Sequence, residues 1–362
     1  MAIKISSNTV IPDISGNITC QNLAVGIFAL AVNTSGCFNT AIGFDALCSN
    51  TSGSCNTALG ANTLNLNTIG IDNVAIGSGA LCSNIVGSSN IAIGSSALGL
   101  NATGSANIAI GCQALCANQT GLANLAIGVN ALRANTSGCN NIALGCNALA
   151  LNTTGINNTA IGILALNANT SGSCNVAIGF CALRFNTTGS CNVAIGPTAL
   201  SVVSFGARNV AIGFQAGCAI TTGCCNTIVG GGAGTAVTTG CVNTFVGSAA
   251  GASVTTGIGN VILGSNNGST IATSSCNIII SDGAGTARIT IGSTGNTTLS
   301  GTTQATNTTT GALIVPGGVG VGGSMYVNNR IGFVNNWPSQ QNTSVVFQCY
   351  NTATTSLDTI FG

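Results

Sequence analysis

Apolar and polar residues alternate over short stretches of this chain, and the same arrangement returns every seventeen residues. One copy, NTAIGFDALCSNTSGSC, runs from residue 39 to residue 55, and positions are numbered here from its first asparagine. Positions 2 and 4 are apolar in most copies, as in Val74 and Ile76. An apolar residue at every second position is typical of a strand with one buried face, so a short strand is expected at positions 2 to 4.

The later part of each copy shows a second alternation. Leu at position 9 is followed by a mostly apolar position 11, as in Leu98 and Leu100. Position 10 between them holds residues as different as Cys48 and Arg133, so it is expected to face water. This pattern predicts a second short strand in each repeat.

Every copy begins with asparagine, and no copy is longer or shorter than the others. The first residues are Asn22, Asn39, Asn56, Asn73, Asn90, Asn107, Asn124, Asn141, Asn158, Asn175, Asn192, Asn209, Asn226, Asn243, Asn260 and Asn277. Two strands with glycine corners, such as Gly43 and Gly53, fit one coil of a solenoid, since a helical hairpin repeat needs roughly twice that length. The sequence predicts an all-β β-solenoid of sixteen coils over residues 22–293, roughly 75 to 80 Å long.

The position-1 asparagines have two interpretations. They can form a ladder along the rod, in which each amide hydrogen-bonds the amides above and below it, as in stacked cross-β structures. They can also be simple turn residues. Their recurrence in all sixteen copies, while other polar positions vary, favours the ladder.

The repeat changes character towards its end. Position 9 becomes glycine from Gly217 onward, position 3 changes from alanine to a large residue at Ile228, and position 12 changes from asparagine to an apolar residue at Val203. One large side chain is lost as another is gained, which constant packing volume requires if positions 9 and 3 share one space. The pairs expected in contact are Leu183 with Ala194, Leu200 with Ala211, and Gly217 with Ile228.

Two segments flank the repeats. Residues 1–21 alternate apolar and polar residues and are expected to cap the first coil or to dock onto another protein. Residues 294–362 are rich in Thr and Gly and are expected to form a further β segment that ends in a tip. This last segment holds the chain's single Trp and both Tyr residues, so Trp337, Phe347 and Tyr350 are candidates for a recognition surface.

Composition argues against catalysis. The chain has six Lys and Arg residues, five Asp and Glu residues and no His, so the usual acids, bases and metal ligands are nearly absent. We expect no enzyme activity, metal or cofactor. A net charge of +1 predicts no nucleic-acid partner, and no apolar run is long enough to insert into a membrane. The opening residues lack the continuous apolar segment of a secretory signal.

The chain has eighteen cysteines. Three pairs occupy the same position on neighbouring coils: Cys20 with Cys37, Cys174 with Cys191, and Cys224 with Cys241. Neighbouring coils lie about 4.8 Å apart, within the Cα separation that a disulfide needs, so these pairs are candidate disulfides. The alternative is that the cysteines are free thiols that serve as small apolar residues.

The repeat NTAIGxxALxxNTSGxx resembles the arrays of phage and large-virus tail-fibre proteins, and its N-x-A-I-G core is similar to the head repeats of trimeric autotransporter adhesins. The segments MAIKISSNTVI and GALIVPGGVGVGGSMYV also resemble the start and the post-shaft segment of such viral fibres. The resemblance implies a homotrimer with three coils side by side around a long axis. It also implies a role in host attachment or particle decoration.

These observations predict a non-enzymatic fibre shaft on a virion surface. Its expected partners are further copies of itself, other virion or surface proteins through residues 1–21, and a host receptor or glycan at the C-terminal end. One alternative is a subunit of an extracellular filament, in which residues 1–21 complete the sheet edge of the next molecule by strand addition. Another is a bacterial adhesin stalk, although the chain shows neither a signal peptide nor a membrane-anchoring barrel.

Overall fold

The computed structural model describes residues 21–300, 349–350 and 357–358. The chain divides into two compact units, Met1–Ser300 and Gly301–Gly362. In the second unit, β19 (Cys349–Tyr350) and β20 (Leu357–Asp358) pair antiparallel. Residues 1–20, Trp337 and Phe347 lie outside the described residues, and Tyr350 belongs to β19.

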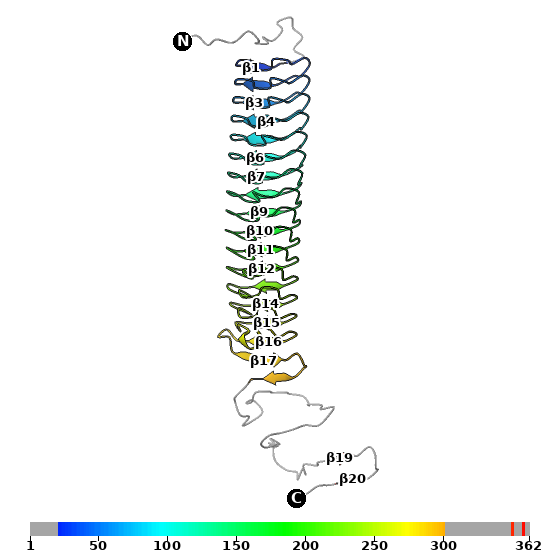
Figure 1. Cartoon of the computed structure of the whole chain (residues 1–362), viewed down its shortest axis with the longest axis vertical. Helices are drawn as coiled ribbons and strands as arrows, with labels where there is room; N and C mark the ends of the chain where they lie inside the picture. Colours follow the sequence, from blue (N-terminus) through cyan, green and yellow to red (C-terminus); the bar gives the residue numbers. More distant parts are fainter. Residues whose placement is uncertain (1–20, 301–348, 351–356, 359–362) are drawn as a thin grey trace, which may run out of the picture. The chain divides into compact units, whose positions relative to one another are not determined.

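The first unit is a β-solenoid, as predicted. Sixteen short strands stack in parallel along its long axis and lie across that axis (Figure 1). Each strand pairs in register with the strand one repeat later, so that Ala41, for example, lies opposite Ala58. The strands are β1 (Leu23–Val25), β2 (Thr40–Ile42), β3 (Thr57–Leu59), β4 (Val74–Ile76), β5 (Ile91–Ile93), β6 (Ile108–Ile110), β7 (Leu125–Ile127), β8 (Ile142–Leu144), β9 (Thr159–Ile161), β10 (Val176–Ile178), β11 (Val193–Ile195), β12 (Val210–Ile212), β13 (Thr227–Val229), β14 (Thr244–Val246), β15 (Val261–Leu263) and β16 (Ile278–Ser281).

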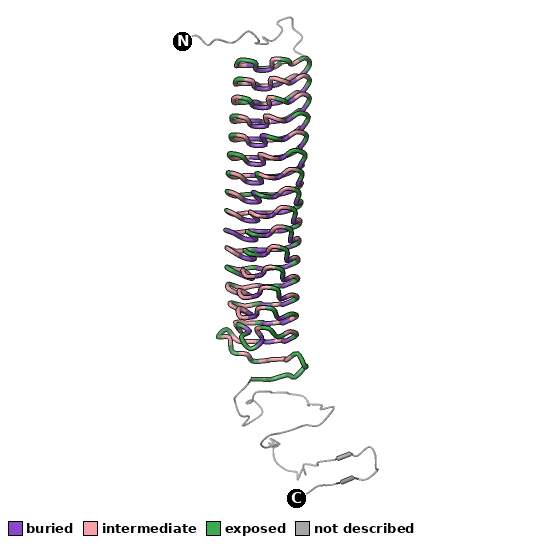
Figure 2. Tube along the Cα trace, viewed as in Figure 1, coloured by how far each residue is buried: buried purple, intermediate pink, exposed green. Residues whose placement is uncertain are grey.

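The strand at positions 2 to 4 turns its middle residue inward, which corrects the face expected from the sequence. Ala41 is fully buried, whereas Thr40 and Ile42 on either side of it are only partly buried. Figure 2 shows buried segments that recur at similar places from one coil to the next. Only a methyl group at position 3 fits beside the buried Leu of position 9 in this narrow interior. The larger residues of positions 2 and 4 therefore point outward.

The second strand expected in each repeat does not form. Positions 6 to 11 are a series of turns, because the backbone is left-handed at positions 7 and 9, as at Asp45 (φ 53°) and Leu47 (φ 50°). Positions 8 and 9 are buried, but position 11 points outward, with Leu100 52% exposed. This turn segment still bonds coil to coil, since the Leu47 amide donates to the Thr63 carbonyl at 3.0 Å.

The glycine corners behave as predicted, for two different reasons. Gly43 has φ 142°, a conformation that only glycine adopts readily. A Cβ atom at Gly53 would overlap the Gly70 carbonyl oxygen and the Asn50 Oδ1 atom. Position 5 therefore needs backbone freedom, and position 15 needs the absence of a side chain.

The core changes along the solenoid in the way that the sequence indicates. A Cβ atom at Gly217 would lie 3.2 Å from Ile228 Cδ1 and 3.1 Å from Leu200 Cδ2. The expected contact between Gly217 and Ile228 is therefore confirmed, and Leu200 of the preceding coil also occupies this space. One coil further on, the Phe245 ring lies against Gly251 of its own coil. A large residue at position 3 therefore fills the space left by glycine at position 9 within one coil as well as between neighbouring coils. The Leu183–Ala194 and Leu200–Ala211 contacts stay predictions.

The sixteenth repeat copy does not close a coil, so the solenoid has about fifteen turns instead of sixteen. After β16 the chain reverses and forms β17 (Ala287–Ile291) and β18 (Thr297–Leu299), which pair antiparallel. The preceding coil carries a short 3-10 helix, η1 (Ser269–Ile271). The repeat pattern therefore ends in a hairpin.

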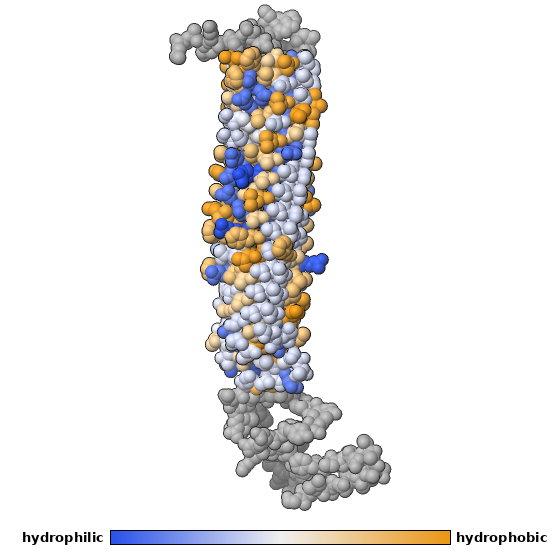
Figure 3. All heavy atoms as spheres, viewed as in Figure 1, coloured by the Kyte–Doolittle hydropathy of each residue, from blue (hydrophilic) through white to orange (hydrophobic). Residues whose placement is uncertain are grey.

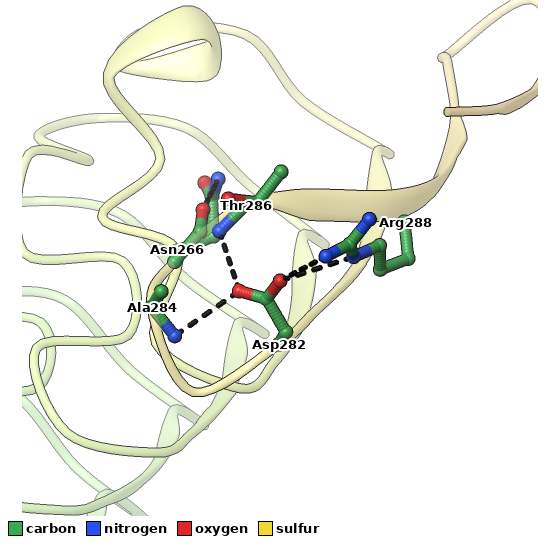
Figure 4. Close-up of polar contacts among 6 residues, drawn as sticks. Asn266, Asp282, Ala284, Thr286 and Arg288 are labelled. Carbon is green, nitrogen blue, oxygen red and sulfur yellow. Dashed lines mark hydrogen bonds and ion pairs between the residues drawn. The ribbon is translucent and has the colours of Figure 1, made fainter. Parts of the chain in front are cut away.

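A carboxylate holds the turn between β16 and β17 (Figure 4). Asp282 accepts hydrogen bonds from the Thr286 amide at 2.9 Å and the Ala284 amide at 3.1 Å, and it pairs with Arg288 at 2.7 Å. Asn266 of the previous coil donates to the Gly285 carbonyl at 2.8 Å. The hairpin is thus fastened to the last coil.

Candidate functional site

The position-1 asparagines form a continuous hydrogen-bonded column inside the solenoid. The Asn56 amide N–H donates to Asn39 Oδ1 at 3.0 Å, and Asn56 Nδ2 donates to the same oxygen at 3.1 Å. Asn56 Nδ2 also donates to the Gly70 carbonyl of its own coil at 2.9 Å. The backbone bond to the asparagine one coil earlier recurs from Asn39 to Asn277. Each buried amide therefore joins two coils.

A second asparagine column runs at position 12, which sequence reasoning missed although asparagine recurs there in ten consecutive copies. Asn50 Nδ2 donates to Asn33 Oδ1 at 2.8 Å, and Asn67 Nδ2 donates to Asn50 Oδ1 at 2.9 Å. The two columns meet at the position-15 carbonyl, because Gly53 O accepts from both Asn39 and Asn50 at 2.9 Å. The members are Asn33, Asn50, Asn67, Asn84, Asn101, Asn118, Asn135, Asn152, Asn169 and Asn186.

Cooperative amide columns of this kind stiffen the stack. A buried amide is costly unless its donors and acceptor are bonded, and bonding here requires the neighbouring coil to be in place. Backbone hydrogen bonds join the same neighbours at the strand and at the turns. Separating any two coils therefore breaks several buried bonds at once.

The outer face of the parallel sheet is apolar along its whole length. Position 4 is Val, Leu or Ile in every strand from β1 to β16, and these side chains are half-buried or exposed. They are Val25, Ile42, Leu59, Ile76, Ile93, Ile110, Ile127, Leu144, Ile161, Ile178, Ile195, Ile212, Val229, Val246, Leu263 and Ile280. Position 2 beside them is Val, Leu, Ile or Thr. We call the side chains of positions 2 and 4 the outer sheet face.

The outer sheet face is large for a monomer. At about 4.8 Å per coil it extends for roughly 70 Å, and two side chains across a strand span about 10 Å, giving an area on the order of 700 Å². Typical monomers expose apolar patches of about 300–600 Å², and a stable interface buries about 800 Å² on each partner. Figure 3 shows apolar side chains in separate groups on the visible side of the solenoid, most of them in its upper half.

Charged groups are absent from this face. Between residues 21 and 276 the charged residues are Asp45, Asp72, Arg133, Arg184 and Arg208, and none of them is at position 2 or 4. In the described part of the chain, no three His, Cys, Asp or Glu side chains come together as a metal site would require. Nor do residues 21–300 include a helix with the length and hydropathy to span a membrane.

The three candidate cysteine pairs have different outcomes. Cys37 is disulfide-bonded, and Cys20, the partner expected for it, lies outside the described residues. Cys174 and Cys191 are exposed free thiols. Cys224 and Cys241 are also free thiols, but their Sγ atoms lie 3.0 Å apart.

Comparison with models of protein families, with curated proteins and with solved structures finds no match to this chain.

Proposed function

We propose that this chain is the structural shaft of a fibre on a virion surface, without catalytic activity, and that copies of it associate side by side as a homotrimer through the outer sheet face. The observation that carries the proposal is an uncharged apolar face that runs unbroken along a stack of coils stiffened by buried amide columns. The stiffness of the stacked coils supports a role as a spacer, and the outer sheet face supports association between copies of the chain.

A second copy of the chain fits this face better than a globular partner. The apolar residues of the face recur once per coil, so a copy lying alongside presents apolar residues at the same spacing over the whole length. Three copies around one axis form a closed assembly in which each face is covered. The similarity of the N-x-A-I-G core to trimeric repeats favours three.

Sedimentation of the full chain tests the proposal. A trimer has about three times the 35.1 kDa mass of one chain. The double variant Ile93→Asp and Ile127→Asp places two charges on the outer sheet face and is expected to sediment as a monomer with an unchanged circular dichroism spectrum. The matched control, Leu100→Asp and Leu151→Asp, alters exposed position-11 residues and is expected to stay trimeric. A monomeric wild type, or equal effects of both double variants, would contradict the proposal.

The end of the solenoid offers support for a second candidate, the filament subunit. All three residues of β18 are exposed, and in the described part of the chain this strand pairs only with β17. An open strand edge can accept a strand from another molecule. Electron microscopy separates the candidates, since discrete rods support the fibre shaft and open-ended polymers support the filament.

A further inference from the structure

Position 16 of the repeat places neighbouring side chains against each other. In several coils this position is serine, and the serine hydroxyl accepts the amide N–H of position 16 one coil earlier. Ser105 Oγ, for example, accepts from the Ser88 amide at 3.0 Å. The backbone therefore directs each position-16 side chain towards position 16 of the preceding coil.

Cys224 and Cys241 occupy this position on neighbouring coils. The Cys224 amide donates to Cys241 Sγ at 3.1 Å, which is the same contact that serine makes elsewhere. The two Sγ atoms lie 3.0 Å apart, with the Cys224 thiol as donor. A disulfide needs an S–S distance of about 2.05 Å, so a movement of about 1 Å would close the bond. Both side chains are partly exposed, so a small reagent can reach them.

The contact between the two sulfurs keeps the Cys224 thiol protonated. The hydrogen bond from Cys224 to Cys241 is the largest cause that raises the pKa of Cys224, to about 12, and partial burial and repulsion by the Cys241 and Cys225 sulfurs add to it. Cys224 thus holds its proton and donates it to the Cys241 sulfur. Cys224 is therefore unsuited to the first attack on a disulfide reagent, and we assign that attack to Cys241.

We propose that Cys224 and Cys241 form a redox modification site, which closes to a disulfide by exchange with a small disulfide reagent such as oxidised glutathione. The Cys241 thiolate attacks one sulfur of the reagent, breaks its S–S bond and releases one thiolate. Cys224 then loses its proton to water and attacks Cys241 Sγ, which releases the second thiolate. Two protein thiols are oxidised, and one reagent disulfide is reduced to two thiols.

The first step prepares the second. In a mixed disulfide the Cys241 sulfur can carry no negative charge, so it no longer repels a Cys224 thiolate. Its contact with Cys224 is one of the causes that raise the Cys224 pKa, and the change therefore favours ionisation and attack by Cys224.

The bond would lie at the junction of the two core types. Cys224 belongs to the coil that combines Ala211 with Gly217, and Cys241 belongs to the next coil, which introduces Ile228. A disulfide here would close a loop of one repeat and so restrict the unfolded chain at the point where the packing changes. This role is independent of the proposed function, because position 16 is not part of the outer sheet face.

The chain contains an internal control. Cys174 and Cys191 are also one coil apart at equivalent positions, but they occupy position 17, where the backbone is left-handed, with φ 59° and 60°. Both are exposed free thiols. They share the spacing of the proposed site without its direct sulfur contact.

The test uses the full reduced chain in glutathione buffers of increasing oxidised fraction. Remaining thiols are alkylated under native conditions, and unreduced peptides are mapped by mass spectrometry. We expect a Cys224–Cys241 cross-link at oxidised fractions where Cys174 and Cys191 are still alkylated. Equal oxidation of both pairs, no cross-link, or a Cys225–Cys241 bond would overturn the proposal.

Two single variants test the order of attack. Cys224→Ser keeps a residue that other coils carry at position 16, such as Ser54, and is expected to accumulate one glutathione adduct on Cys241. The matched variant Cys174→Ser is expected to form the Cys224–Cys241 cross-link as the wild type does. A Cys224→Ser protein with an unmodified Cys241 would contradict the assignment of Cys241 as the attacking thiolate.

Discussion

At the residue scale, the position-12 column shows how a buried polar ladder gives way to apolar packing. The column ends at Asn186, whose buried Oδ1 has no hydrogen-bond partner, because the next coil carries Val203 at this position. Beyond it the column continues as buried apolar residues, including Ile220 and Val237. The unpaired Oδ1 of Asn186 results from the change, at position 12, from a column of asparagines to a column of apolar residues.

This junction predicts that the same substitution has different effects at two positions. Val203→Asn places an amide where its Nδ2 can donate to Asn186 Oδ1, so we expect a loss in unfolding free energy below about 1 kcal/mol. Val237→Asn puts an amide between apolar neighbours and is expected to lower the unfolding free energy by about 2 to 4 kcal/mol. Urea denaturation of both variants measures the difference. Equal losses would show that the Asn186 oxygen is not available to a new donor.

At the element scale, the sequence predicted the repeat geometry but not every element within it. The constant period and the glycines at positions 5 and 15 led to the correct coil. Stacked coils need equal lengths, position 5 needs a positive φ, and position 15 has no room for a side chain. The prediction of a second strand was wrong, because the apolar residues Leu98 and Leu100 are spaced as they would be in a strand. In the structure Leu98 is held in a left-handed turn by its own burial, which a pattern of hydropathy does not reveal.

The buried face of the strand at positions 2 to 4 was predicted wrongly for a related reason. Hydropathy ranks Ile42 above Ala41, so the larger residue was expected inside. The interior beside Leu47 has room only for the alanine methyl group, and the isoleucine points outward. An apolar face that residues 21–300 leave uncovered cannot be distinguished from a core face by sequence periodicity alone.

The hairpin that follows the last coil is expected to depend on pH. The hydrogen bond from the Thr286 amide is the largest cause that lowers the pKa of Asp282 in the folded state, and the hydrogen bond from the Arg288 side chain is the second. A carboxyl group whose folded pKa is lowered contributes stability above its unfolded pKa of about 3.9, and the contribution is lost as pH falls through the folded pKa. We expect the protection factor of the Thr286 amide in hydrogen exchange to decrease below about pH 4. Asp282→Asn should have low protection at every pH, and a pH-dependent factor in that variant would contradict this explanation.

At the scale of the whole solenoid, the number of coils determines the length of the solenoid. Every repeat from Asn22 to Cys276 has the same number of residues, and coils that share one core type bond to their neighbours in the same way, so coils are interchangeable within such a region. The outer sheet face has the same property, because position 4 is apolar in every coil. The length of the solenoid and the extent of the outer sheet face therefore change together when repeats are added or removed.

This equivalence leads to a prediction about deletions. Removing residues 107–140, two complete repeats, joins position 17 to position 1 and preserves every later contact, so we expect a folded solenoid shorter by about 10 Å. Removing residues 107–132 joins position 17 to position 10 and misplaces both asparagine columns, and we expect this variant to lose cooperative unfolding. Small-angle scattering gives the lengths, and thermal unfolding gives the cooperativity. If both deletions fold equally well, the coils are not coupled by the amide columns as described, because only the first deletion keeps each buried amide opposite its partner.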